Sequence, residues 1–503
     1  MYLKEPKYSF NNPVLWSVFI TYIIVSGLTI FHHELWGDEI HSWNIAKASN
    51  SFSDLISNTR YEGHPPFWYT ILWVVSKFTH DVSMIQWAQF IIGVTITFLI
   101  LFASAFPFVT RLLIPFGYFF LYEYAAFSRS YAIGFLIAFS ICIILHKNFK
   151  YNILLYYTFL FLLANTHLLT LVLATGFHIY FLLSFFEKKK KTNLLLHTVI
   201  GLIILIPSVY FIFPPADSSL NTDFWLQRLD DSRLSVIIKA PVRAFLPIPA
   251  WWNYHFWNTE FLAEAQAQFS FLKWFLGLLS IALLFFTTII FKKNKKVFFF
   301  YLAILLMFFL LSIIIPFANS RQVGFIFIGF LLAYWLFCYH NTISRSQNTI
   351  LTILLAIQII AGIFSVVKEI KYPFSYGYKS KELLDEIPAG NKIVTDYWCL
   401  NTLTAFTDRA YYCVDLEKEV SYLLWNGEMT SMLKKNDRYS NGLLTFLKKE
   451  SLKKVYMISI YPVERLYQFD KQLPVLFSIY LIDKKEGAIE KGSNLYLYEI
   501  NSK

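Results

Sequence analysis

The sequence predicts a polytopic α-helical membrane protein followed by a C-terminal soluble α/β domain. Of its 503 residues, 56% are hydrophobic and only 15% are charged, whereas soluble domains carry about 25% charged residues. The charges are also concentrated, because residues 368–503 hold 20 of the 44 Lys and Arg and 18 of the 33 Asp and Glu. We therefore expect a membrane domain at 1–367 and a soluble domain at 368–503.

Apolar runs of roughly 17–25 residues mark transmembrane helices. The sequence predicts about eleven spans, near residues 14–32, 83–106, 112–127, 129–146, 151–165, 167–186, 194–213, 268–290, 297–316, 322–339 and 348–367. The first lacks a small-residue cleavage site and is expected to be retained. The run at 67–78 is too short for a full span and is typical of a re-entrant or interfacial helix.

Lysine-rich runs set the expected orientation. "EKKKK" at 187–191 and "KKNKK" at 292–296 each end an apolar segment, as the positive-inside rule predicts for cytoplasmic ends. The net charge of +11 is therefore assigned to membrane anchoring, and no nucleic-acid partner is expected. An even number of spans precedes each run, which is consistent with a cytoplasmic N-terminus. Three more spans follow the second run, so we expect the C-terminal domain to lie outside the cytoplasmic membrane.

In this topology a set of polar residues falls at the outer ends of the spans. "LWGDEIHSW" contributes two adjacent carboxylates, and further motifs contribute two histidines and two arginines. Taken singly, these are typical of solvated loop charges, turn residues or snorkelling side chains. Together they predict a site for an anionic lipid-linked substrate. The residues are Asp38, Glu39, His64, Arg129, His167 and Arg321.

Glu123 is different because it lies inside a predicted span. A charge at bilayer depth costs about 2.5–3.5 kcal/mol on insertion scales. The sequence therefore predicts a partner or a water-filled cavity for this carboxylate, and it does not identify the partner.

The motifs resemble those of a known family. "WGDEIHSWNIAKASNSFSDLI…YEGHPPFWYTILW", then "FSRSYAIGFL", "ANTHLLTLVL" and "NSRQVGFIFIGFLLAYW", are similar to the GT-C glycosyltransferases of the protein O-mannosyltransferase and aminoarabinose transferase type, family 39 and its bacterial relatives. The resemblance covers residues 14–367. It implies a GT-C fold, a multi-pass protein of the bacterial cytoplasmic (inner) membrane, and an active site on its extracytoplasmic side.

The resemblance also implies a role for each site residue. Asp38 would act as the general base toward the acceptor hydroxyl, and Glu39 would help to position the acceptor or the loop. His64 matches the "HPP" motif beside the lipid phosphate. Arg129 matches the Arg of an "R-x-Y-A" stretch, although many relatives have Pro before the Tyr. His167 and Arg321 align with further family patterns and are assigned to donor-phosphate or substrate binding.

The expected reaction moves a hexosyl or pentosyl group from a polyprenyl-phosphate donor to an acceptor hydroxyl by one inverting displacement. Cationic groups would stabilise the leaving phosphate while a carboxylate takes the hydroxyl's proton. No Gly-rich nucleotide-binding loop is evident, which favours a donor that is not a nucleotide. The acceptor could be a glycan, a lipid or a protein. The sequence assigns no cofactor with certainty, and a divalent metal stays open, with Asp38, Glu39, His64 and His167 as conceivable ligands.

Two outer loops and the soluble domain complete the expected organisation. The first loop is at 33–82 and the second at 214–266, where "DFWLQRL" and the tryptophans Trp251, Trp252 and Trp257 predict a segment at the membrane interface. In the soluble domain, 391–398, 453–461 and 494–500 are expected as strands and 380–388 as a helix. A disulfide between Cys399 and Cys413 is expected in an exported domain.

A transporter or flippase of a lipid-linked saccharide is the alternative function. Transporters place polar residues near the bilayer midplane and often contain internal repeats. Here the polar set lies at the ends of spans, and no repeat is evident. A scaffold without activity would be expected to lose the acidic pair or the "HPP" motif, and both are present.

Overall fold

The computed structural model describes residues 10–146, 151–187, 191–219, 231–266, 268–269, 271–315, 317 and 319–503. The chain forms two compact units. A helical unit comprises Met1–Phe31, Gln86–Ile212 and Thr222–Ile370, and a mixed unit comprises His32–Ile85, Phe213–Asn221 and Lys371–Lys503. The whole of the expected first outer loop, 33–82, therefore belongs to the same unit as the C-terminal residues.

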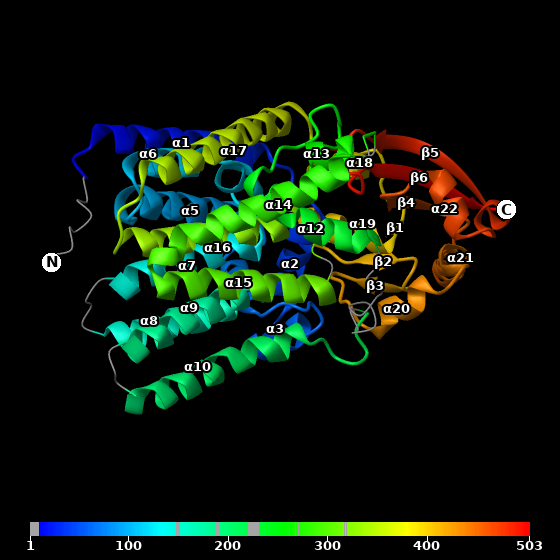
Figure 1. The fold of residues 1–503 in the computed structure, drawn as a ribbon. Coiled ribbons are helices and arrows are strands. Elements are labelled where there is room, and N and C mark those ends of the chain that lie inside the picture. Colours follow the sequence, from blue (N-terminus) through cyan, green and yellow to red (C-terminus); the bar gives the residue numbers. More distant parts are fainter. Residues whose placement is uncertain are drawn as a thin grey trace. The chain divides into compact units, whose positions relative to one another are not determined.

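The helical unit is a bundle of long apolar helices that run side by side (Figure 1). Within the described residues, eight helices are long and apolar enough to cross a membrane, and α7 and α8 are shorter apolar helices. The chain is thus a multi-pass membrane protein, as predicted. The apolar helices are α1 (Pro13–His32), α5 (Met84–Phe98), α7 (Ser130–His146), α8 (Asn152–Ala164), α9 (Leu168–Glu187), α10 (Lys191–Ile212), α14 (Leu272–Ile289), α15 (Lys295–Ile314), α16 (Ser320–Cys338) and α17 (Arg345–Lys371).

Helix α16 is buried along almost its whole length and packs against α7 and α15. Helix α7 in turn approaches α9 closely at Gly134, where a Cβ atom would lie 2.4 Å from the Thr170 side chain. Small residues allow such close approach of membrane helices. This packing brings together the first turns of three helices that carry predicted site residues.

The predicted span at 112–127 is not one continuous helix. This stretch is helical only in pieces: α6 (Phe108–Leu113), a 3₁₀ turn at Ile114–Phe116 and a π-helical turn at Phe119–Glu123. Pro115 lacks the backbone N–H that a continuing α-helix would use, and its ring clashes with the preceding turn. The expected topology therefore depends on this broken segment crossing the membrane.

The segment 214–266, which the sequence predicts as a second outer loop, contains α12 (Asp231–Phe245) and α13 (Phe261–Ala265), both in the helical unit. Helix α12 packs against α14 and α16. Trp251 and Trp252 are about half exposed, at 53% and 51%, which suits a segment at the membrane interface. The "DFWLQRL" stretch lies outside the described residues.

The mixed unit combines three helices from the first outer loop with a six-stranded sheet. The loop helices are α2 (Gly37–Ala48), α3 (Phe52–Thr59) and α4 (Phe67–Ser76). Helix α4 has 10 residues and spans about 15 Å, roughly half of a bilayer core. It is too short to cross by itself, as the sequence indicates.

The sheet has the strand order β3-β2-β1-β4-β6-β5. Strands β1, β2 and β4 are parallel to one another, and the other pairs are antiparallel. The strands are β1 (Ile393–Thr395), β2 (Tyr411–Cys413), β3 (Lys418–Val420), β4 (Lys454–Ser459), β5 (Phe477–Lys485) and β6 (Leu495–Ser502). Strands β1, β4 and β6 and helix α18 (Ser380–Asp385) confirm the four predicted elements, and β2, β3 and β5 were not predicted.

Helices cover both faces of the sheet. Alternate residues of a strand point to opposite faces. In β4, Val455 and Met457 join one hydrophobic cluster, while Tyr456 and Ile458 join another. The covering helices are α19 (Tyr397–Thr407), α20 (Gly427–Leu433), α21 (Arg438–Glu450), α22 (Val463–Phe469) and α23 (Leu473–Leu476).

The expected disulfide is wrong. Cys399 in α19 and Cys413 in β2 are both free thiols and both fully buried. They belong to the same hydrophobic cluster, where each packs as a small apolar side chain. Burial raises the pKa of both thiols, so both are protonated and unreactive at neutral pH.

Candidate functional site

The acidic pair begins a helix rather than lying in an irregular loop. Trp36 is the N-cap of α2, with extended backbone, and Asp38 and Glu39 lie in its first turn. Negative side chains are stabilised at this end of a helix by its dipole. Consecutive helical residues point about 100° apart, so the two carboxylates face different surroundings. Asp38 is half-buried, whereas Glu39 is fully buried.

The Glu39 carboxylate is held by two donors. Its Oε2 atom lies 3.0 Å from His33 Nε2, and it accepts a hydrogen bond from the Trp36 backbone N–H at 3.2 Å. The His33 ring also contacts Phe374 at 4.6 Å between centroids. Glu39 therefore fixes the start of α2 and the preceding loop, whereas Asp38 at the preceding position is only half-buried.

The "HPP" segment packs against the same helix. Glu62 is buried; its Oε1 lies 3.0 Å from His41 Nε2, and its Oε2 accepts from the Tyr69 hydroxyl at 3.0 Å. Asn401 Nδ2 lies 3.1 Å from His41 Nδ1. Because the amide donates to Nδ1, Nε2 carries the proton and donates to Glu62. His64 follows this anchor and is half-buried, and helix α4, which begins at Phe67, packs against α2.

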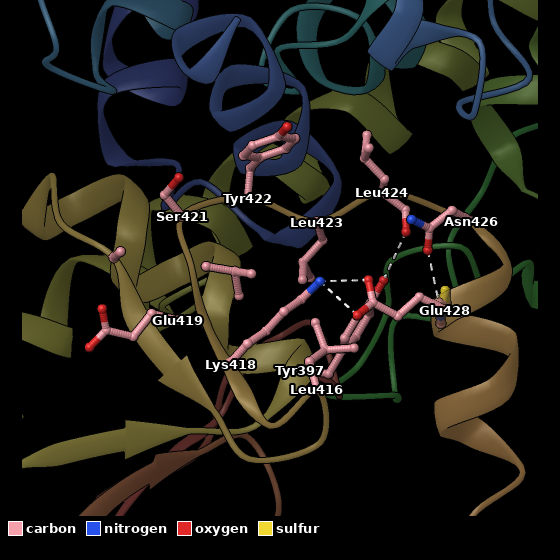
Figure 2. A pocket seen from close by; sticks show the side chains of 13 residues that line it. Tyr397, Leu416, Lys418, Glu419, Ser421, Tyr422, Leu423, Leu424, Asn426 and Glu428 are labelled. Atoms are coloured by element: carbon pink, nitrogen blue, oxygen red, sulfur yellow. Dashed lines mark hydrogen bonds and ion pairs between the residues drawn. The ribbon is translucent and has the colours of Figure 1, made fainter. Parts of the chain in front are cut away.

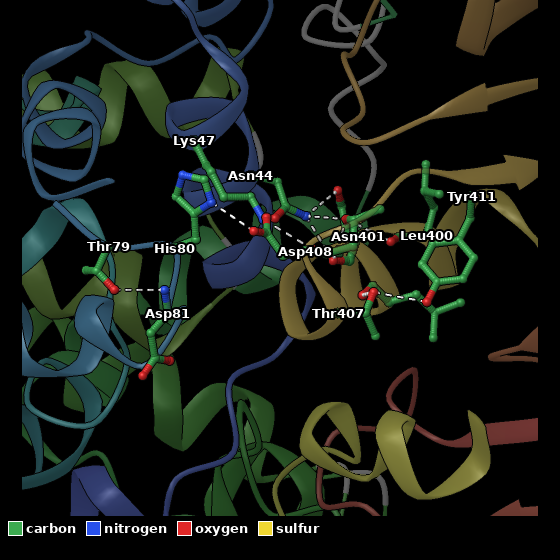
Figure 3. A network of polar contacts seen from close by, with 12 residues as sticks. Asn44, Lys47, Thr79, His80, Asp81, Leu400, Asn401, Thr407, Asp408 and Tyr411 are labelled. Carbon is green, nitrogen blue, oxygen red and sulfur yellow. Dashed lines mark hydrogen bonds and ion pairs between the residues drawn. The ribbon is translucent and has the colours of Figure 1, made fainter. Parts of the chain in front are cut away.

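A polar network joins α2 to α19 (Figure 3). Asn44 Nδ2 donates to the Asn401 carbonyl at 2.9 Å, and Lys47 Nζ donates to Asp408 at 2.8 Å. His80 Nδ1 lies 2.8 Å from the other Asp408 oxygen. Partial burial alone would raise the pKa of Asp408, but these two partners lower it. The network fixes the helix of the acidic pair on the C-terminal domain.

The predicted cationic residues belong to the helical unit, where all three begin helices. Arg129 directly precedes α7, His167 directly precedes α9, and Arg321 is the second residue of α16. The His167 ring lies 4.7 Å from the ring of Tyr131 in α7 and 6.2 Å from that of Phe325 in α16. The helical unit therefore brings the starts of these three helices together.

Glu123 has partners that the sequence did not reveal. The Tyr118 hydroxyl donates to its Oε2 at 2.7 Å. Trp257 and Arg321 also interact with this carboxylate, and the Arg321 guanidinium lies 5.5 Å from the centre of the Trp257 ring. Trp257 is thus part of a buried charged cluster, not simply an interfacial tryptophan as predicted.

Arg243 is a further member of this cluster that sequence reasoning missed. Its guanidinium is buried and donates to the Ser320 hydroxyl at 3.4 Å and to the Asn258 carbonyl at 3.3 Å. It also interacts electrostatically with Glu123 and Glu260. A single Arg in "KAPVRAF" resembles any arginine of an outer loop. Only the packing of α12 against α16 shows its role.

Among the described residues, no three His, Cys, Asp or Glu side chains gather as a metal site. Of the four conceivable ligands, Glu39 is already held by His33 and the Trp36 N–H. A metal there would have to displace these donors.

Comparison with known proteins gives one informative match. No protein-family model matches the chain, and no curated protein matches it by sequence. The crystal structure of ArnT from Cupriavidus metallidurans in the apo state matches with a TM-score of 0.50 and 10% sequence identity, over 96% of this chain and 97% of that chain. At this identity the match shows the fold alone. The chain therefore has the GT-C fold that its motifs predict, with a C-terminal α/β domain.

Proposed function

We propose that the protein is a membrane glycosyltransferase that moves a sugar from a polyprenyl-phosphate donor to an acceptor hydroxyl on the outer face of the cytoplasmic membrane. The observation that supports this most is the first turn of α2, where Asp38 is accessible and Glu39 is locked in place. A fold shared with ArnT, a GT-C enzyme, agrees with this activity.

Asp38 is the proposed general base. A general base must be ionised before the reaction and must reach the proton that it removes. Its position in the first turn of a helix of 12 residues favours the ionised form, because the helix dipole stabilises a negative charge there. Glu39 positions this base by fixing the helix start, and His64 on the neighbouring segment is proposed to face the donor's phosphate.

Arg129, His167 and Arg321 are proposed to bind the donor phosphate. A positive side chain at a helix N-terminus is opposed by the helix dipole, at a cost of about 0.3–1 kcal/mol each. Arg129 and Arg321 occupy such positions, and an anion bound among them would be stabilised both by the helix ends and by the guanidinium groups. His167, whose Nδ1 accepts from the Leu169 N–H at 3.1 Å, would add a neutral Nε2–H donor. The same groups would stabilise the phosphate as it leaves the anomeric carbon in a single inverting displacement.

A transporter of a lipid-linked saccharide is the second candidate. The observation that favours it is the buried charge inside the helical unit, where Glu123 lies with Arg243 and Arg321. Buried charges within membrane proteins often line substrate pathways. However, a transporter gives the accessible carboxylate of Asp38 no chemical role.

Deletion of the gene, followed by mass spectrometry of surface glycans and lipids, separates the two functions. For a transferase, deletion removes one sugar residue from a surface glycan, lipid or protein; the wild-type gene restores it and Asp38→Asn does not. For a transporter, the whole lipid-linked saccharide is lost from the outer surface, and Asp38→Asn restores it. The second result would exclude the proposed function.

A further inference from the structure

An apolar groove of about 590 Å³ runs between α12 and α14, and Phe309 of α15 completes its lining. The three helices lie side by side within the helical unit (Figure 1). Sites that bind ligands in proteins have volumes of about 300–1,000 Å³. The groove therefore has room for a bound molecule.

One wall of the groove is an exposed apolar stripe on α14. Trp274, Leu278 and Ile281 are spaced as i, i+4 and i+7, so they share one face of the helix, and they are 78%, 69% and 66% exposed. Ile238 of α12 stands opposite and is 50% exposed. At Gly277 a Cβ atom would lie 3.8 Å from the Ile238 side chain, so the missing side chain keeps the groove open. These side chains fit an apolar ligand that removes them from contact with polar solvent.

The groove has about the length of one leaflet of a bilayer. Its lining on α14 runs from Lys273 to Leu284, which is about 16 Å at 1.5 Å per residue. The hydrocarbon core of a bilayer is about 30 Å thick, so the groove extends over about half of it. Because α14 is long and apolar enough to cross a membrane, a lipid chain along its first half fits this depth.

Two lysines lie at one end of the groove. Lys239 of α12 and Lys273 of α14 both line it and interact electrostatically with each other. Burial lowers the pKa of Lys239; Glu260 acts in the opposite direction, while Lys273 and Arg243 lower this pKa further. Three cations and one carboxylate leave an excess of positive charge. An anion bound between the two lysines would relieve their repulsion.

The cavity of the C-terminal domain differs from the groove in this respect (Figure 2). Its lysine, Lys418, lies 2.6 Å from Glu428 Oε1, so its charge is already compensated. Among the residues that the structure describes, neither Lys239 nor Lys273 has a carboxylate at such a distance. Only the groove therefore combines an apolar lining with cations that an anion would complement.

We infer that the groove binds a membrane phospholipid with an anionic headgroup. The phosphate would lie between Lys239 and Lys273 and accept charge-assisted hydrogen bonds from both, and one acyl chain would lie along the apolar stripe of α14. Basic pockets between transmembrane helices bind anionic headgroups in this way. None of the residues proposed to bind the donor phosphate lines the groove, so the inference does not rest on the proposed function.

Native mass spectrometry of the delipidated full-length protein in detergent tests this inference. The protein is titrated with phosphatidylglycerol and with phosphatidylcholine of the same acyl chains. We expect phosphatidylglycerol to bind about tenfold more tightly or better, because the choline group offsets the phosphate charge. The double variant Lys239→Met with Lys273→Met should weaken phosphatidylglycerol binding about tenfold or more and remove this preference.

Gly277→Leu tests the groove separately from the lysines. The new side chain fills the groove without a clash at its first atom, so the melting temperature should stay at the wild-type value. Both lipids should bind about tenfold more weakly, because several methylene groups of the chain lose their burial. Wild-type affinity in this variant would show that no lipid chain lies in the groove and would overturn the inference.

Lys292→Met with Lys293→Met is the matched control. These exposed lysines end the 3₁₀ turn that follows α14 and do not line the groove, so the control removes the same charge from the other end of the helix. It should bind phosphatidylglycerol as the wild type does. The inference is wrong if the control loses as much affinity as the Lys239 and Lys273 variant, or if phosphatidylcholine binds as tightly as phosphatidylglycerol. It is also wrong if excess inorganic phosphate displaces the lipid, or if decaprenyl phosphate displaces it and binds more tightly, since the groove would then hold the donor.

Discussion

The two units use helix N-termini in opposite ways. In the mixed unit the first turn of α2 holds Asp38 and Glu39, an arrangement that the helix dipole stabilises without any ligand. In the helical unit Arg129 directly precedes α7 and Arg321 lies in the first turn of α16, where the dipole opposes a positive charge unless an anion lies nearby. The carboxylates therefore lie where the protein itself stabilises them, whereas the arginines lie where the helix dipole opposes them and, for Arg321, where Glu123 compensates.

The largest expected effect tests the acidic site. Asp38→Asn keeps the shape of the side chain but removes its basicity, so turnover should fall by about 10²–10⁴-fold, the usual contribution of a general base. The helix should persist because Asp38 is only half-buried. Release of polyprenyl phosphate from a synthetic donor measures turnover, and circular dichroism measures the fold.

Glu39→Gln is the matched comparison at the next residue. Because Glu39 is buried and held by His33, this change should cost about 1–3 kcal/mol of stability and reduce turnover less than Asp38→Asn does. If Glu39→Gln abolished turnover while Asp38→Asn did not, the two roles would be reversed. If neither change mattered, the acidic pair would have no part in catalysis.

The second prediction tests the cationic site. Arg321→Met should weaken binding of a polyprenyl phosphate by about tenfold or more, because charge-assisted hydrogen bonds are lost. It should also lower stability by about 1–3 kcal/mol, because Glu123 loses a cationic neighbour in a buried position. Titration with decaprenyl phosphate and thermal unfolding in detergent measure the two effects.

The double variant Arg321→Met with Glu123→Gln separates these effects. Removing both charges should restore much of the melting temperature but not the affinity for the phosphate. A double variant that binds decaprenyl phosphate as the wild type does would show that Arg321 has a structural role only.

The sequence predicted those features of the two units whose signals are local, and it did not predict those that depend on packing between distant residues. Apolar runs predicted the long helices, and β-branched and aromatic residues predicted β4 and β6, because both signals are local. The sequence did not reveal that Glu39 is buried and Asp38 is not, because this difference arises from the rotation of about 100° between consecutive residues of a helix. The partners of Glu123 were not visible either, because Arg243 and Arg321 are distant in sequence and approach it only when α12 packs on α16.

A third prediction concerns the pH dependence of the mixed unit. Burial and the neighbouring Asp396 raise the pKa of Asp415 to about 7, although the Tyr397 N–H and Arg438 act in the opposite direction. The folded state therefore binds this proton more tightly than the unfolded state does. The resulting stability is present below about pH 4 and is lost as the pH rises to about 7.

The melting temperature of the full-length protein should therefore fall between pH 5 and pH 7.5, and it should fall less in Asp415→Asn. Asp385→Asn, at an exposed position in α18, is the control and should follow the wild type. Equal slopes in the wild type and Asp415→Asn would show that Asp415 does not titrate in this range.

The smallest expected effect concerns the cysteines, for which the predicted disulfide and the structure disagree. The chain has four cysteines, and Cys399 and Cys413 are buried free thiols. An alkylating reagent should label neither of these two in the native protein, because burial keeps them protonated and inaccessible. After denaturation without any reductant it should label both, and the reductant should leave the native melting temperature unchanged. A disulfide between them would stabilise the domain by about 3 kcal/mol. The structure would be contradicted if the denatured, unreduced protein were not labelled at these cysteines and if reduction clearly lowered the melting temperature of the native protein.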